Sequence, residues 1–87
     1  MAKVEEKPRS TLDEAVLFAV TEAQLLVLQD EPVDRGAREL LRWLRRRKVL
    51  ELAVQRVSQD AALVPEEVTR QKVTELLEYA LATGLLY

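Results

Sequence analysis

Two short segments rich in turn-forming residues divide a chain that is otherwise made of helix formers. The first is Asp30-Glu31-Pro32, with Asp34 and Gly36 close behind, and the second extends from Ser58 to Pro65. Elsewhere Ala, Leu, Glu, Arg and Gln dominate, and no stretch alternates apolar and polar residues as a strand does. The sequence therefore predicts an all-α fold of three helices in an antiparallel arrangement.

The length of 87 residues fits one domain, which we place at residues 11–87. Residues 1–10 are charged and contain Pro8, and they are predicted to form a disordered charged tail. The longest apolar stretch, Leu12 to Leu28, is interrupted by charged residues, which excludes a membrane span. The absence of cysteine fits a reducing compartment, so we expect a cytoplasmic protein with no membrane partner.

The first predicted helix has large apolar residues on two sides. One broad arc, from Leu12 to Val27, recurs at helical spacing and is the expected core face. The opposite side carries four more large apolar residues among polar ones: Leu17, Phe18, Leu25 and Leu28. A monomeric three-helix domain has no use for them there, so we expect a second chain to cover this stripe.

The second predicted helix is long, from Val33 or Asp34 to about Gln59, and its apolar pattern changes phase partway. The first stripe is Ala37, Leu40, Leu41 and Leu44. The second, rotated by more than about 90°, is Trp43, Leu50, Ala53, Val54 and Val57. The helix is either continuous, packing its halves on different neighbours, or broken near Arg47. Because no Gly or Pro marks a break, a continuous central helix is the prediction.

The third predicted helix has Pro65 at its first position, where a missing N–H does no harm. Its apolar stripe is Val73, Leu76, Leu77, Ala80 and Leu81. The chain then ends on the apolar residues Leu85, Leu86 and Tyr87, which we expect to dock on a core or a partner.

Catalytic and metal-binding residues are not expected. The chain has no histidine and no cysteine, and the sequence offers no candidate general base for Ser10 or Ser58. A di-iron bundle site needs histidine, and a phosphate loop needs more glycine than Gly36 and Gly84 supply. We therefore predict no catalytic, cofactor-binding or metal-binding residues, no cofactor, and a protein that is not an enzyme.

The charge is strongly segregated along the chain. Between Arg35 and Lys48 seven basic residues and one acid give +6, while the other 6 basic and 14 acidic residues give −8. Such a pattern can pair within the molecule or attract a partner of opposite charge. The candidate residues for an acidic partner or for phosphate are Arg35, Arg38, Arg42, Arg45 and Arg46.

The surplus apolar surface favours a helical dimer or larger assembly. Apolar side chains recur at spacings of seven, four and three in the second stripe of the central helix, as an interhelical seam requires. The residues predicted for self-association are Phe18, Leu25, Leu28, Trp43, Leu50, Val54 and Val57. The predicted function is thus a non-enzymatic protein interaction or assembly module. The alternative is a nucleic-acid-binding regulator that uses the arginine face, which would lose affinity steeply with salt.

Overall fold

Four helices pack around one apolar core. The computed structural model describes residues 11–84, apart from the side chain of Thr11. The predicted charged tail (1–10) and the apolar chain end (85–87) lie outside the described residues. The helices are α1 (Thr11–Leu28), α2 (Val33–Trp43), α3 (Arg47–Gln59) and α4 (Glu67–Gly84). Within residues 11–84 all the regular secondary structure is helical, which confirms the all-α part of the predicted fold.

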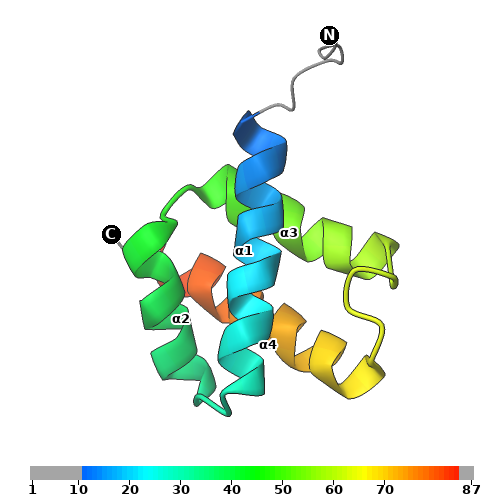
Figure 1. Cartoon of the computed structure of the whole chain (residues 1–87). Coiled ribbons are helices and arrows are strands. Elements are labelled where there is room, and N and C mark those ends of the chain that lie inside the picture. The colour runs from blue at the N-terminus through cyan, green and yellow to red at the C-terminus, as the bar shows by residue number, and fades with distance from the viewer. Residues whose placement is uncertain (1–10, 85–87) are drawn as a thin grey trace, which may run out of the picture.

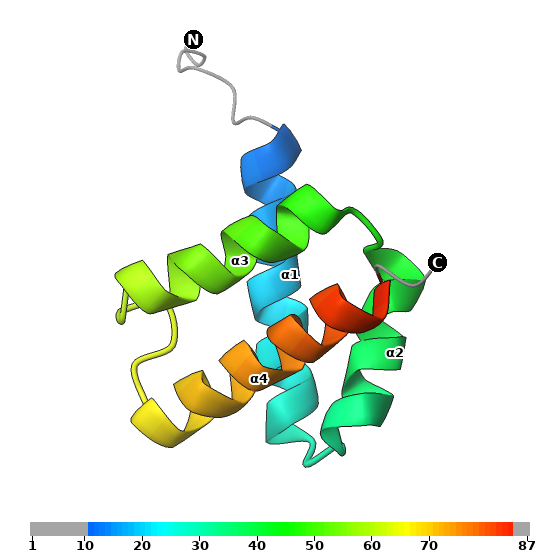
Figure 2. The same cartoon turned by 180° about the vertical axis from the view of Figure 1, so that it is seen from behind.

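Helix α1 lies across one side of the molecule and the other three helices cover its inner face. Figure 1 shows α1 in front, α2 beside it, and α3 and α4 behind. The reverse view shows α3 and α4 running antiparallel across α1 (Figure 2). Consequently one side of α1 faces the core and the opposite side faces solvent.

The core is built from the apolar stripes that the sequence predicts. Helix α1 contributes Val16, Ala19, Val20 and Ala23, and α4 contributes Val73, Leu76, Leu77 and Ala80. Helices α2 and α3 add Ala37, Leu40, Leu41, Val49, Leu50, Ala53 and Val57, while Leu44 and Val64 come from the connections. All of these side chains are buried within one chain. The folded monomer therefore has a complete core of its own.

The turn after α1 forms where the sequence predicts it. Asp30 adopts a left-handed conformation (φ 65°). The Glu31 N–H donates to the Leu26 carbonyl at 3.2 Å, and the Asp30 N–H donates to the Val27 carbonyl at 3.0 Å. This pair of bonds is the Schellman arrangement, which satisfies carbonyls at a helix end. Pro32 follows directly and begins the turn into α2, so α1 and α2 lie side by side.

The predicted continuous central helix is wrong, and the three-helix count with it: the chain leaves the helical conformation at Leu44–Arg46. Leu44 (φ −136°, ψ 109°) and Arg46 (φ −83°, ψ 114°) are extended. A straight helix would point the core stripes of its two halves in different directions. The turn instead lets Leu44 and Leu50 reach the same core. It forms without Gly or Pro because burying both stripes outweighs the hydrogen bonds lost at the break.

Candidate functional site

The outward side of α1 carries a stripe of exposed apolar side chains. At 100° per residue, Phe18, Leu25 and Leu28 fall within an arc of about 80°, opposite the core-facing residues. Phe18 is 43% exposed, Leu25 46% and Leu28 65%. Glu14 and Thr21 lie in the same arc and are also exposed. We call Phe18, Leu25 and Leu28 the outer stripe.

The charges of α1 are all acidic. The helix contains Asp13, Glu14 and Glu22 and has no lysine or arginine. Asp13 forms an ion pair with Arg56 of α3 at 3.6 Å, which ties the first turn of α1 to its neighbour. Glu14 is exposed in the same arc of α1 as the outer stripe, and Glu22 is half-buried at the edge of that arc. The exposed face of α1 is therefore both apolar and acidic.

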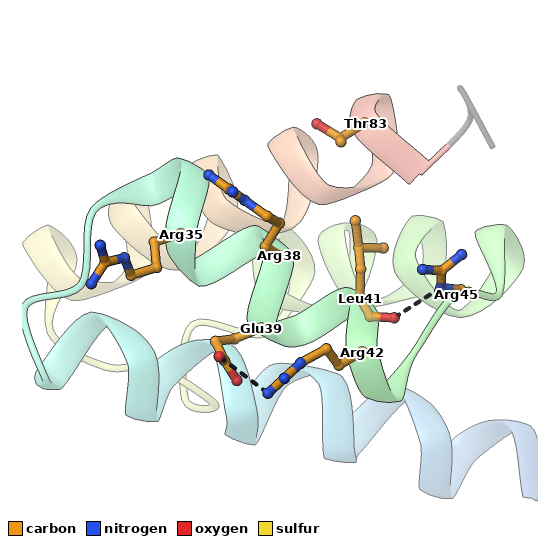
Figure 3. A pocket seen from close by; sticks show the side chains of 7 residues that line it. All are labelled: Arg35, Arg38, Glu39, Leu41, Arg42, Arg45 and Thr83. Carbon is orange, nitrogen blue, oxygen red and sulfur yellow. Dashed lines mark hydrogen bonds and ion pairs between the residues drawn. The ribbon is translucent and has the colours of Figure 1, made fainter.

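A hollow of about 670 Å³ lies on α2, lined mainly by arginines. Its walls are Arg35, Arg38, Glu39, Leu41, Arg42, Arg45 and Thr83, a set that we call the arginine hollow. The arginines at 35, 38 and 42 follow the helical repeat of α2, and Arg45 comes from the extended segment after it. Figure 3 shows Arg38 on the side of α2 nearer Thr83, and the Glu39–Arg42 pair on the side nearer α1.

Two arginines of the hollow form exposed ion pairs within the chain. Arg38 pairs with Asp34 and Arg42 with Glu39, each at 3.5 Å and each largely exposed. The Arg45 Nε donates to the Leu41 carbonyl at 3.3 Å at the end of α2. Exposed ion pairs of this kind are worth about 0–1 kcal/mol and exchange readily for other partners. The hollow therefore presents cationic side chains that an anionic group can bind.

The structure brings four of the five predicted basic residues together. Arg35, Arg38, Arg42 and Arg45 line the hollow, whereas Arg46 is exposed at the start of α3 and lies outside its lining. Sequence reasoning missed Leu41 and Thr83 as parts of this site. Thr83 comes from the end of α4, and no local pattern links it to the arginines. Leu41 reads as a core residue, which it also is.

The predicted self-association residues divide into two groups. Phe18, Leu25, Leu28 and Trp43 are exposed, and their role in self-association stays a prediction. Leu50 and Val57 are instead fully buried in the chain's own core, and Val54 packs against that core. Because α3 is turned relative to α2, the argument that these three α3 side chains need a second chain does not hold.

The described residues provide neither a metal cluster nor a membrane span. Within residues 11–84, no three His, Cys, Asp or Glu side chains are grouped so that they could hold a metal ion. None of the helices described here has the length and apolar character needed to cross a bilayer. The candidate site consists of two surfaces, the outer stripe on α1 and the arginine hollow, which is lined mainly by residues of α2.

Comparison with known proteins gives no relative for this chain. No protein-family model matches it, and neither a curated protein nor a solved structure is significantly similar to it.

Proposed function

We propose that this chain is a non-enzymatic assembly module that binds a second copy of itself through the outer stripe of α1. The observation that supports this proposal is the exposure of Phe18, Leu25 and Leu28 on one face of a surface helix. The outward face of a surface helix ordinarily carries polar and charged residues rather than large apolar ones. Contiguous apolar surface on a small protein is a common mark of an interaction site.

Association also suits the size of the chain. A domain of this length buries roughly 60–65% of its unfolded surface and is only marginally stable alone. A partner that binds the folded state stabilises it by mass action. Full burial of an exposed Phe or Leu side chain contributes about 1.5–3 kcal/mol to the free energy of association. The outer stripe has three such side chains, and each is already partly buried in the monomer. The outer stripe alone therefore falls short of the roughly 8 kcal/mol that a micromolar dimer needs, so the interface must include further surface.

A second candidate function is nucleic-acid binding through the arginine hollow. The specific observation in its favour is that one helical face gathers Arg35, Arg38 and Arg42 beside Arg45. Phosphate contacts need such a cationic face, and affinity would then fall steeply as salt rises. Against it stands the chain's net charge of −2. An apolar interface, by contrast, would persist or strengthen in high salt.

Sedimentation or light scattering of a double variant tests the proposed function. Phe18→Ser with Leu25→Ser removes the centre of the outer stripe without entering the core, so the helical circular dichroism should be unchanged. We expect the native chain to be dimeric or larger at tens of micromolar and this variant to be monomeric. Val68→Ser is the matched control, because Val68 is 58% exposed in the first turn of α4 and is not part of the outer stripe.

Two outcomes would contradict the proposal. One is a native chain that stays monomeric above about 100 μM, where even a weak specific dimer would be populated. The other is an equal loss of assembly in the Val68→Ser control. A gel shift of labelled duplex DNA or RNA at about 50 mM salt tests the second candidate in the same samples.

A further inference from the structure

The outer stripe needs a counterpart on the second copy. This inference rests on the proposed function and specifies the partner surface. We propose that α1 of each copy lies across the arginine hollow of the other, so that each hollow is filled by the partner's α1. Two reciprocal α1–α2 contacts then make one dimer with twofold symmetry.

Charge complementarity favours this pairing over α1 against α1. Helix α1 is acidic and has no basic residue. In a contact between two copies of α1, all the charged side chains of both helices would therefore be acidic. Like charges brought together at an interface oppose binding. The hollow offers four arginines against the single acid Glu39. Glu14 and Glu22 of one copy are therefore suited to Arg38 and Arg42 of the other.

The side chains around the hollow are of the kind that interfaces use. Trp43 follows Arg42 in the sequence, lies outside the lining of the hollow, and is 70% exposed at the end of α2. Tryptophan and arginine are the residue types most enriched where interfaces gain their binding energy. Leu41 adds an apolar element to the lining of the hollow. An apolar and acidic helix such as α1 matches both parts of this surface.

The fold meets the geometric requirement of a twofold dimer. Such an interface needs one patch that carries both complementary halves. Helices α1 and α2 are consecutive, are joined by a short turn, and lie side by side on the molecule (Figure 1). The outer stripe and most of the residues that line the hollow therefore lie on neighbouring helices, which allows one twofold interface to include both. Each contact between α1 and a hollow occurs twice in the dimer. The interface therefore buries twice the area of a single such contact.

A charge-exchange experiment tests the pairing. One variant carries Arg38→Glu and Arg42→Glu, and the other carries Glu14→Arg and Glu22→Arg. Each alone should dimerise at least about tenfold more weakly than the native chain, since like charges then face each other. An equimolar mixture should recover native affinity, because in the heterodimer one contact is native and the other has exchanged charges. Lys72→Glu, an exposed change on α4, is the control and should dimerise normally.

Each other outcome overturns the inference in a distinguishable way. If the Arg→Glu variant dimerises normally while the Glu→Arg variant does not, α1 lies in the interface but packs on a surface other than the arginine hollow. The pairing is then wrong, although the proposed function survives. If both variants dimerise normally, neither charged surface lies in the interface. If the Arg→Glu variant dimerises normally but no longer shifts a labelled duplex, the hollow binds nucleic acid instead.

Two safeguards keep the test decisive. The Arg→Glu variant places new acids near Asp34 and Glu39 and could weaken α2, so circular dichroism must show native helix content. If it does not, Arg38→Gln with Arg42→Gln replaces it, and weaker dimerisation is again the expected result. A monomeric native chain would refute the proposed function itself, independently of which surface pairs with which.

Discussion

Gly36 in α2 and Leu76 in α4 approach so closely that a Cβ at position 36 would lie 2.7 Å from Cδ1 of Leu76. The same Cβ would lie 3.8 Å from Cβ of Leu26 in α1. Leu76 is fully buried, so its side chain cannot swing into solvent to make room. The missing side chain of Gly36 therefore allows α1, α2 and α4 to meet at one point.

Gly36→Ala should destabilise the chain although alanine is the better helix former. Alanine gains up to about 1 kcal/mol in helix propensity, whereas overpacking a buried site costs about 1–3 kcal/mol. We expect a net loss of about 1 kcal/mol, measured as a lower urea midpoint by circular dichroism. Leu76→Val should recover part of this loss in the double variant. An unchanged midpoint for Gly36→Ala would show that α4 moves freely away from α2.

Leu50→Ala should lower the free energy of unfolding by about 2–5 kcal/mol, the usual effect of emptying a buried leucine site. Leu50 is 1% exposed within a single chain, so this loss should not depend on protein concentration. Leu28→Ala is the matched control and should change monomer stability by less than about 0.5 kcal/mol. Thermal melts at two protein concentrations measure the loss of stability in each variant. Equal losses for the two variants would contradict the core described above.

Much of the fold could be predicted because it follows from local patterns. The turn at Asp30-Glu31-Pro32 and the core faces of α1 and α4 depend on residues close together in the sequence. The break between α2 and α3 does not. Nothing local to Leu44 or Arg46 excludes a helix, and the break forms because both halves must reach one core. That is a tertiary effect, and the only sequence signal was the phase change in the apolar pattern.

The candidate site could be predicted only in part for the same reason. The outer stripe lies on α1, and Arg35, Arg38 and Arg42 lie on α2, so helical spacing reveals them. Arg45 and Arg46 instead lie in the break between α2 and α3. Trp43 was predicted to share one stripe with Leu50, Val54 and Val57. In the structure Trp43 is 70% exposed, whereas Leu50 and Val57 are buried in the core. Thr83 joins the hollow only because α4 ends beside α2, and no sequence spacing encodes that contact.

Arg47→Pro should leave the fold intact, whereas Arg42→Pro should unfold it. Arg47 is the first residue of α3 and follows the extended Arg46, which is the setting that a proline prefers. Arg42 lies inside α2, where proline costs about 3 kcal/mol or more. Circular dichroism of the two variants tests the break directly. A continuous helix through residues 44–46 would make both prolines comparably destructive.

Arg46→Asp should stabilise the monomer by about 0.5–1 kcal/mol. Arg46 is the N-cap of α3, makes no capping hydrogen bond, and precedes a first turn without acidic residues. An aspartate there can accept from an orphan N–H and favours the positive end of the helix dipole. Arg46→Ala should stabilise the monomer less than Arg46→Asp does, because alanine removes the cation without adding a capping group. A lower melting temperature for Arg46→Asp than for Arg46→Ala would contradict this account.

Trp43, the chain's single tryptophan, should report directly on the proposed dimer. It is 70% exposed in the monomer, so dilute protein should fluoresce like tryptophan in water and be quenched readily by acrylamide. If α1 of a second copy covers α2, raising the concentration should shift the emission to shorter wavelength and reduce quenching. The variant with Phe18→Ser and Leu25→Ser should show no such concentration dependence. If Trp43 stays fully accessible in a dimer detected by light scattering, the two copies do not meet at this end of α2, and the pairing of α1 with the arginine hollow is wrong.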